Sequence, residues 1–332
     1  MQLDSVRDLK AALTASVLAP LSAAGASRGL AMAAQPLTGA STGMHRTIAL
    51  GIVRKSSSDF KLAVRLQRRE MESSPQMDLI RKRAKDEVDV RYVGRIFKRA
   101  TPWHQKRNRP LRVGGSVGHF KITAGTLGCF VKSRSDGTVM MLSNNHVLAN
   151  ENDAKAGDAI LQPGALDGGQ RPRDVAGALA DFVKLKAAGV NRVDCATATI
   201  KKGIKYRHKP LTGLGNLAGL GPDFLDEGTG VAKVGRTTGT TRGKVTAFEL
   251  DNVMVRYDVG VCRFDGQVEV ESTGDDPFSL GGDSGSLIVD DERKAVALLF
   301  AGSEQGGSNG MGLTFCNPIR AVLDALKVDL LY

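Results

Sequence analysis

One segment, Gly-Gly-Asp-Ser-Gly-Ser at residues 281–286, constrains this chain more than any other. Glycine adopts positive φ at little steric cost, so Gly282 and Gly285 allow a tight turn around Ser284. A serine on such a turn, with free backbone N–H groups beside it, has the arrangement of a nucleophile next to an oxyanion site. The alternative is an ordinary Gly/Ser hairpin. The choice depends on whether the chain also supplies a base and a group that orients the base.

The chain contains five histidines: His45, His104, His119, His146 and His208. His146 stands in Ser-Asn-Asn-His-Val-Leu-Ala at residues 143–149, where an apolar strand ends at a polar tip. His119 is the nearest alternative. We expect His146 to be the base.

The orienting group is predicted to be Asp194. It interrupts an apolar strand at residues 193–198, and a carboxylate buried there needs a partner such as an imidazole. Asp174 and Asp181 also lie between the histidine and the serine along the chain, and they remain alternatives.

Four segments together resemble the chymotrypsin-like (trypsin-fold) serine proteases, of the bacterial cytosolic type that also resembles the plant narrow-leaf trypsin-like proteins. The segments are Gly-Thr-Leu-Gly-Cys-Phe-Val at 125–131, the histidine segment at 143–149, Val-Gly-Arg-Thr-Thr-Gly at 234–239 with Thr-Arg-Gly at 241–243, and the serine segment. The resemblance covers about residues 112–318. The chain order His146, Asp194, Ser284 is also that of chymotrypsin.

The resemblance implies a mostly β fold, a chymotrypsin-like double six-stranded β-barrel. Local sequence patterns add a C-terminal helix and, before the barrels, a small α+β N-terminal domain. We expect an N-terminal helical segment (1–45), a small basic ββαβ domain (46–100), a linker (101–112), a first barrel (113–210) and a second barrel with the helix (211–332). Residues 150–182 are expected to form a loop over the first barrel. Many short strands between Gly turns are typical of such barrels.

The resemblance also implies a serine endopeptidase that works through an acyl-enzyme. Ser284 would attack the peptide carbonyl, His146 would move the proton, and Asp194 would stabilise the imidazolium. The N–H groups of Gly282 and Ser284 would hold the oxyanion. The alternative is a pseudo-protease, or a gated sensor whose N-terminal domain binds a partner.

The resemblance places the primary substrate pocket around five residues: Phe278, Ser279, Phe300, Ala301 and Gly302. No aspartate occupies position 278, so a small or medium apolar substrate side chain is expected. Asp275 and Asp276 lie close enough in sequence to keep a basic preference open.

Positive charge is concentrated in the N-terminal third. Residues 1–112 hold 22 Lys and Arg against 9 Asp and Glu, a net +13, which leaves −2 for the rest of a chain of net charge +11. The basic residues gather at Arg81, Lys82, Arg83, Lys85, Arg95, Lys98, Arg99, Lys106, Arg107 and Arg109. A solvated helix face with a basic linker is the simpler interpretation. An acidic protein or nucleic acid is the alternative, although few aromatic residues are interleaved for base stacking.

Smaller elements are predicted from local patterns. Leu9, Leu13 and Val17 have helical spacing, and residues 47–53, 61–66 and 87–96 have the character of strands. Ser74 followed by Pro75 is typical of a helix start. A helix is also expected from 318 to 330.

Arg-Val-Gly-Gly at residues 112–115 resembles a trypsin activation junction. Cleavage after Arg112 would free the Val113 amine to pair with Asp283. The alternative is a Gly-Gly turn that opens the first barrel.

Four cysteines are present, and Cys129, Cys195 and Cys316 lie in apolar runs, which favours reduced thiols and a cytoplasmic protein. Residues 11–27 resemble a signal peptide only weakly, because the leader has no net positive charge. We expect no membrane span, no metal site and no cofactor, and the sequence leaves the oligomeric state open.

Overall fold

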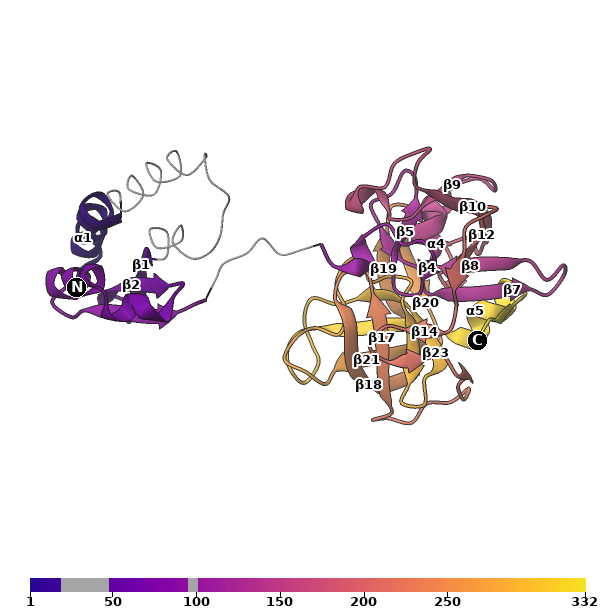
Figure 1. Cartoon of the computed structure of the whole chain (residues 1–332). Coiled ribbons are helices and arrows are strands. Elements are labelled where there is room, and N and C mark those ends of the chain that lie inside the picture. Colours follow the sequence, from indigo (N-terminus) through magenta and orange to yellow (C-terminus); the bar gives the residue numbers. More distant parts are fainter. Residues whose placement is uncertain (19–47, 95–100) are drawn as a thin grey trace, which may run out of the picture. The chain divides into compact units, whose positions relative to one another are not determined.

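The structure is a computed structural model that describes residues 1–18, 48–94 and 101–332. It divides into two compact units, Met1–Ala100 and Thr101–Tyr332 (Figure 1). The predicted basic residues Arg95, Lys98 and Arg99 lie outside the described residues, as do positions 19–45 of the predicted N-terminal segment.

The described residues of the first unit form a three-stranded sheet with two main helices. Its elements are α1 (Leu3–Leu13), a π-helical turn (Thr14–Leu18), β1 (Ile48–Arg54), β2 (Phe60–Leu66), a 3₁₀ turn (Arg69–Ser73), α3 (Pro75–Arg83) and β3 (Val88–Tyr92). Strand β2 pairs antiparallel with β1 and parallel with β3. The Ser74 hydroxyl accepts a hydrogen bond from the Met77 amide at 3.2 Å, so α3 begins as the sequence predicted.

One apolar core holds this unit together. Leu13 and Val17 of the first helical segment are buried against Leu62 of β2 and against Met77 and Ile80 of α3. The first helix thus covers the sheet, and residues 1–18 form one unit with residues 48–94 rather than a separate segment.

The second unit contains two large sheets, and the first of them is an open half-barrel. Its strand order is β25-β7-β8-β12-β10-β9-β5-β6. The strands are β5 (Ser116–His119), β6 (Gly125–Thr126), β7 (Cys129–Ser133), β8 (Val139–Ser143), β9 (Ala159–Leu161), β10 (Val175–Phe182), β12 (Ala196–Ile200) and β25 (Val328–Leu330). The expectation of a loop at 150–182 was wrong, because β9 and β10 bury Ile160, Ala176 and Leu179 in this sheet.

The second sheet closes into a six-stranded barrel. The six strands of the ring are β17 (Gly230–Gly235), β18 (Gly239–Leu250), β21 (Gln267–Ser272), β22 (Leu287–Asp290), β23 (Lys294–Gly302) and β24 (Leu313–Pro318). A seventh short strand, β16 (Gly219–Leu220), pairs in parallel with β23 outside the ring. Closure occurs because β23 pairs with both β22 and β24. The predicted mostly β, two-barrel, chymotrypsin-like fold is confirmed, with one barrel closed and one half open.

Short strands connect these sheets. They are β4 (Leu111–Arg112), β11 (Val190–Asn191), β13 (Tyr206–Arg207), β14 (Pro210–Leu211), β15 (Gly215–Asn216), β19 (Val253–Tyr257) and β20 (Gly260–Phe264). The hairpin β19–β20 extends the second barrel toward the first, where β20 pairs with β11.

Residues 101–112 are packed on the second unit and do not form a free linker. The ring of His104 is buried, and its Nδ1 lies 2.6 Å from the carbonyl oxygen of Arg236. Strand β4 then pairs in parallel with β13.

The C-terminal helix is shorter than predicted. Helix α5 covers Ile319–Ala325, and Lys327 at φ +53° then turns the chain into β25, which pairs with β7 of the first sheet. The chain end therefore returns to the first sheet instead of finishing on the second barrel.

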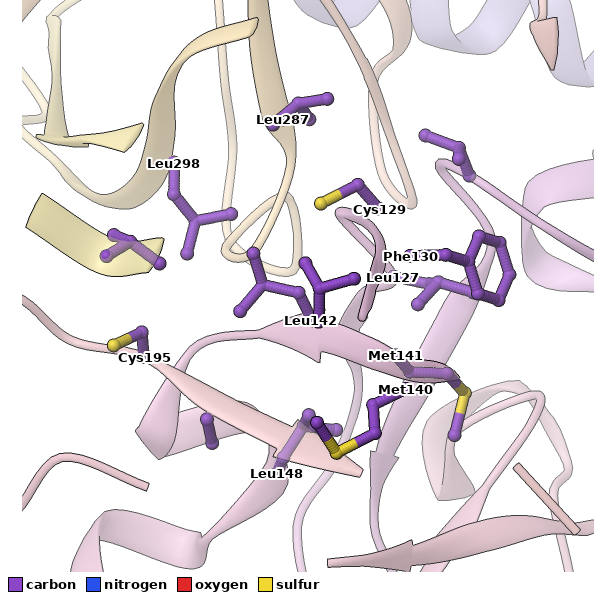
Figure 2. Packing of buried hydrophobic residues seen from close by; sticks show 14 of the residues in the cluster. Leu127, Cys129, Phe130, Met140, Met141, Leu142, Leu148, Cys195, Leu287 and Leu298 are labelled. Carbon is purple, nitrogen blue, oxygen red and sulfur yellow. The ribbon is translucent and has the colours of Figure 1, made fainter. Parts of the chain in front are cut away.

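A continuous core joins the two sheets. Leu127 and Leu142 from the first sheet are fully buried in the same cluster as Leu287 and Leu298 from the second, and Figure 2 shows side chains from both sheets meeting there.

Four free cysteines, at positions 129, 195, 262 and 316, are also buried. In the described part of the chain, no helix is long and apolar enough to cross a membrane.

We predict that Met77→Ala lowers the free energy of unfolding of the first unit by about 2–5 kcal/mol, because it leaves a cavity in that unit's core. The single tryptophan, Trp103, lies in the second unit, so its fluorescence should report an unchanged urea transition there. Amide hydrogen exchange in β2 reports the first unit. Leu79→Ala, at a 38% exposed position of the same helix, is the control. An equal shift of the Trp103 transition would show that the two units unfold together.

Candidate active site

His146 lies on a short helix, α4 (Asn145–Leu148), directly after β8. Its Nδ1 is 2.5 Å from Oδ2 of Asp194, while the histidine side chain remains 20% exposed. Asp194 precedes β12 and has no exposed side-chain surface. Because β8 pairs with β12, the two residues meet at one end of neighbouring strands.

The Asp194 carboxylate is held by several donors. Its Oδ1 accepts from the Asn145 amide at 2.7 Å, and its Oδ2 also accepts from the Tyr257 hydroxyl at 2.8 Å. The Asp194 amide donates to Asn317 Oδ1 at 2.9 Å. Tyr257 comes from β19 in the connecting hairpin and Asn317 from β24 in the second barrel, and nothing in their local sequence pointed to this role.

The surroundings set the protonation states of this group. Burial alone lowers the pKa of His146, but the charge and hydrogen bond of Asp194 outweigh it, so the pKa lies above its ordinary value of 6.5. Burial, together with the Asp194 charge, raises the pKa of Tyr257 well above its usual value. The phenol therefore keeps its proton and donates it to the carboxylate.

The alternatives considered from the sequence lie elsewhere. His119 Nε2 is 3.2 Å from Asp158 Oδ2. Asp174 forms ion pairs with Arg107 and Arg173. Asp194 is thus the carboxylate that contacts His146.

The serine segment forms the tight turn that its glycines suggested. Gly282 has φ +94° and Gly285 has φ +91°. The Asp283 amide donates to the Leu280 carbonyl at 3.0 Å, and the Gly285 amide donates to Leu299 at 2.8 Å. Within the described residues, the amides of Gly282 and Ser284 have no acceptor, and Ser284 Oγ makes no hydrogen bond.

Strand β6 of the first sheet connects this turn to the histidine. The Thr126 amide donates to the Ser284 carbonyl at 2.8 Å, and the Thr126 hydroxyl donates to the Gly282 carbonyl at 3.0 Å. At Gly125, an added Cβ would lie 2.4 Å from Val147 and 3.1 Å from the Ser284 carbonyl oxygen. Only glycine fits between the histidine helix and the serine turn, so the two are close neighbours.

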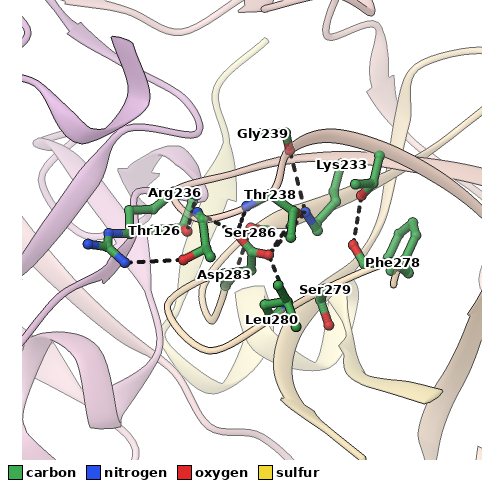
Figure 3. A network of polar contacts seen from close by, with 12 residues as sticks. Thr126, Lys233, Arg236, Thr238, Gly239, Phe278, Ser279, Leu280, Asp283 and Ser286 are labelled. Carbon is green, nitrogen blue, oxygen red and sulfur yellow. Dashed lines mark hydrogen bonds and ion pairs between the residues drawn. The ribbon is translucent and has the colours of Figure 1, made fainter. Parts of the chain in front are cut away.

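Asp283 anchors the turn through a network of polar contacts, part of which Figure 3 shows. Its fully buried carboxylate accepts hydrogen bonds from the amides of Thr237 at 2.7 Å, Thr238 at 3.1 Å and Leu280 at 3.0 Å, and from the Thr238 hydroxyl at 2.8 Å. The Lys233 ammonium, also fully buried, lies 3.4 Å from Oδ2. Burial lowers the pKa of Lys233, although the Asp283 charge acts in the opposite direction.

The contacts of Asp283 are relevant to the possible activation junction at residues 112–115, where cleavage would free the Val113 amine to pair with Asp283. Asp283 has an internal cation and four internal hydrogen-bond donors in the uncleaved chain, so no amine released at Val113 is needed to satisfy it. Val113 is itself buried, with 1% of its surface exposed. The sequence analysis did not single out Lys233, whose position in the apolar strand β17 was the only available signal.

A cavity of about 500 Å³ opens beside Ser284. It is lined by Pro277, Ser279, Leu280, Gly281, Ser284, Leu299, Ala301, Gly302, Ser303, Glu304, Gly310 and Met311. Three of the five predicted pocket residues are among them. Phe278 and Phe300 are not, because the Phe278 side chain is buried in the second barrel and the Phe300 side chain packs on Phe264. Glu304 is the one ionisable side chain in this lining.

The described residues contain no group of three His, Cys, Asp or Glu side chains arranged to hold a metal ion. Burial raises the pKa of the Cys129 thiol, which therefore stays protonated.

Comparison with known proteins gives three findings. Residues 226–317 match the family model described as the Nal1 C-terminal domain. No curated protein sequence matches the chain. Among solved structures, the chain resembles Protease A of Thermobifida fusca, with 18% sequence identity and a TM-score of 0.46. It also resembles the chymotrypsin of Cellulomonas bogoriensis, with 18% sequence identity and a TM-score of 0.44. Each match covers 67% of this chain and 98% of the other protein. It also resembles a glutamic acid-specific serine protease, with 20% sequence identity and a TM-score of 0.48. This match covers 67% of this chain and 100% of the protease. These similarities concern the fold alone.

We predict that Lys233→Met lowers the free energy of unfolding of the second unit by about 3–5 kcal/mol, because it leaves the Asp283 charge buried without its cation. Urea denaturation followed by Trp103 fluorescence measures this change. The double variant Lys233→Met with Asp283→Asn should recover part of the loss. Lys244→Met removes a surface partner of Glu271 and should cost less than about 1 kcal/mol. An equally small loss for Lys233→Met would contradict the role assigned to the buried pair.

Proposed function

We propose that residues 101–332 form a serine endopeptidase in which His146, Asp194 and Ser284 act as a catalytic triad. The observation that carries the proposal is the 2.5 Å contact between His146 and Asp194, next to a serine turn with two unpaired amides. Ser284 lines a cavity large enough for a substrate side chain. The match to the Nal1 C-terminal domain supports the finer assignment to the bacterial type akin to plant narrow-leaf proteins.

The proposed mechanism assigns a role to each of these groups. Ser284 Oγ attacks the peptide carbonyl while His146 Nε2 accepts its proton, and the same nitrogen then protonates the leaving amine. Asp194 keeps the proton of His146 on Nδ1 and stabilises the imidazolium. The amides of Gly282 and Ser284 donate to the oxyanion, and water releases the acyl group by the reverse path. The absence of a Ser284–His146 hydrogen bond agrees with the looser contacts common without bound substrate.

The pocket lining favours a basic substrate side chain over the small apolar one that the sequence suggested. Glu304 supplies the negative charge, and Ser279 and Ser303 supply neutral acceptors. The backbone of residues 300–302 would pair with the substrate as an added strand. Regulation through the N-terminal unit is a further part of the proposal. A cytoplasmic location is also proposed, and the four buried, unpaired thiols support it.

A fluorophosphonate probe tests the triad directly. We expect it to label the wild-type chain, and Ser284→Ala and His146→Ala to abolish labelling, because the probe reacts only with an activated serine. His119→Ala is the matched control and should still be labelled. If folded wild-type protein is not labelled, the triad is not assembled, and the pseudo-protease or gated-sensor alternative is favoured.

We further predict that Tyr257→Phe lowers kcat/KM about 10-fold and moves the acid limb of its pH profile to higher pH. Without the phenol, Asp194 has one donor fewer and binds the imidazolium more strongly, which raises the pKa of His146. Since the base must be neutral, activity then requires a higher pH.

The matched control for this variant is Tyr206→Phe, whose ring stacks on Phe130 away from the site. Tyr206→Phe should leave the pH profile unchanged. A Tyr257→Phe profile identical to that of the wild type would show that Tyr257 does not position Asp194.

A further inference from the structure

Outside the candidate active site, a cluster of positively charged residues in the second unit surrounds an open cavity of about 520 Å³. We call this cavity the basic cleft. It is lined by Arg107, Arg109, Pro110, Arg173, Val175, Lys201, Lys202, Gly203, Ile204 and Lys205. Six of these ten residues carry a permanent positive charge.

Three segments that are distant in sequence form the basic cleft. Residues 107–110 are brought to residues 201–205 by the pairing of β4 with β13 and by the hydrogen bond from the Leu111 amide to the Lys205 carbonyl at 2.8 Å. Residues 173–175 join them at the start of β10. The fold therefore brings these positive charges together, and they do not come from one basic stretch of sequence.

The cations are only partly neutralised. Asp174 pairs with Arg107 at 3.1 Å and with Arg173 at 2.8 Å. Among the described residues, no carboxylate lies within ion-pair distance of the other four cations, which are Arg109, Lys201, Lys202 and Lys205. One carboxylate against six cations leaves the cleft with a net charge of about +5.

Arg109 is held in place by neutral groups. Its guanidinium donates to Gln162 Oε1 at 2.5 Å and to the Asn108 carbonyl at 2.8 Å. Burial, with the neighbouring Arg107, lowers the pKa of Arg109. A guanidinium that is already fixed beside other cations is preorganised for binding an anion, because less side-chain freedom is lost on binding.

We propose that the basic cleft binds a compact ligand that carries several phosphate groups. Guanidinium and ammonium groups are the usual phosphate ligands in proteins. The volume is that of a small-molecule site. The lining contains no aromatic side chain on which nucleobases could stack, which favours a compact polyphosphate over a single-stranded nucleic acid.

Calorimetric titration of the full chain with inorganic triphosphate tests the proposal. We expect saturable binding, at least 10-fold weaker in Lys202→Glu/Lys205→Glu and weaker at 200 mM than at 50 mM salt. Lys184→Glu/Lys186→Glu is the matched control, since it makes the same charge change at exposed positions outside the lining. It should bind within 2-fold of the wild type. Circular dichroism checks that both variants fold.

Three results would overturn the proposal. The first is no triphosphate binding by the wild-type chain. The second is equal affinity in the cleft variant and the wild type, which would place binding elsewhere, for example on the basic N-terminal unit. The third is a short DNA duplex that binds more tightly than triphosphate and loses affinity in the cleft variant, which would favour nucleic acid as the ligand. The titration measures binding of triphosphate. A negative result would therefore say nothing against the proposed protease activity.

Discussion

The buried carboxylate of Asp283 fixes the turn on which the rest of the site depends. Two full charges, Asp283 and Lys233, lie in the protein interior, where neither is stable without the other. Three backbone amides and one hydroxyl also point at the carboxylate, so the loop at 237–238 and the turn at 280–284 cannot move apart without losing them. The unpaired amides of Gly282 and Ser284 are a consequence of that constraint.

The candidate site also requires both sheets to meet closely. His146 and Asp194 come from the first sheet, and Ser284 comes from the turn that precedes β22 of the second. Tyr257 comes from the connecting hairpin β19–β20. The two sheets approach each other closely because glycines lie where they are in contact. At Gly128, for instance, an added Cβ would lie within 2.3 Å of the Gly285 carbonyl oxygen. A side chain at this position would push the serine turn away from the first sheet.

The sequence pointed to the three residues of the proposed triad but not to the residues that hold them in place. His146, Asp194 and Ser284 stand out because each is a polar residue at an unusual place in an apolar or glycine-rich segment. Lys233 and Tyr257 act on Asp283 and Asp194 across 50 and 63 positions of sequence, and their own segments look like ordinary strands. Such long-range partners are set by strand pairing, which no local pattern encodes.

Where the structure differs from what the sequence suggested, the causes are similar. Phe278 and Phe300 have the expected sequence spacing from the serine, but spacing does not determine which way a side chain points, and two large aromatic rings gain more by burial in the barrels. Residues 150–182 are rich in Gly, Ala and Asp, which is typical of loops, yet small residues are what allow β10 to lie close to its neighbours. At Gly177, an added Cβ would lie 1.7 Å from the Thr199 carbonyl oxygen.

A crystal structure of the chain after reaction with a fluorophosphonate would test the central claim most directly. The account predicts a phosphonyl group on Ser284 Oγ, with its oxygen about 2.7–3.1 Å from the amides of both Gly282 and Ser284. It also predicts that Arg112 and Val113 remain joined and that the Lys233–Asp283 pair is intact. An adduct that forms only after cleavage at Arg112, or an oxygen that points away from these two amides, would contradict it.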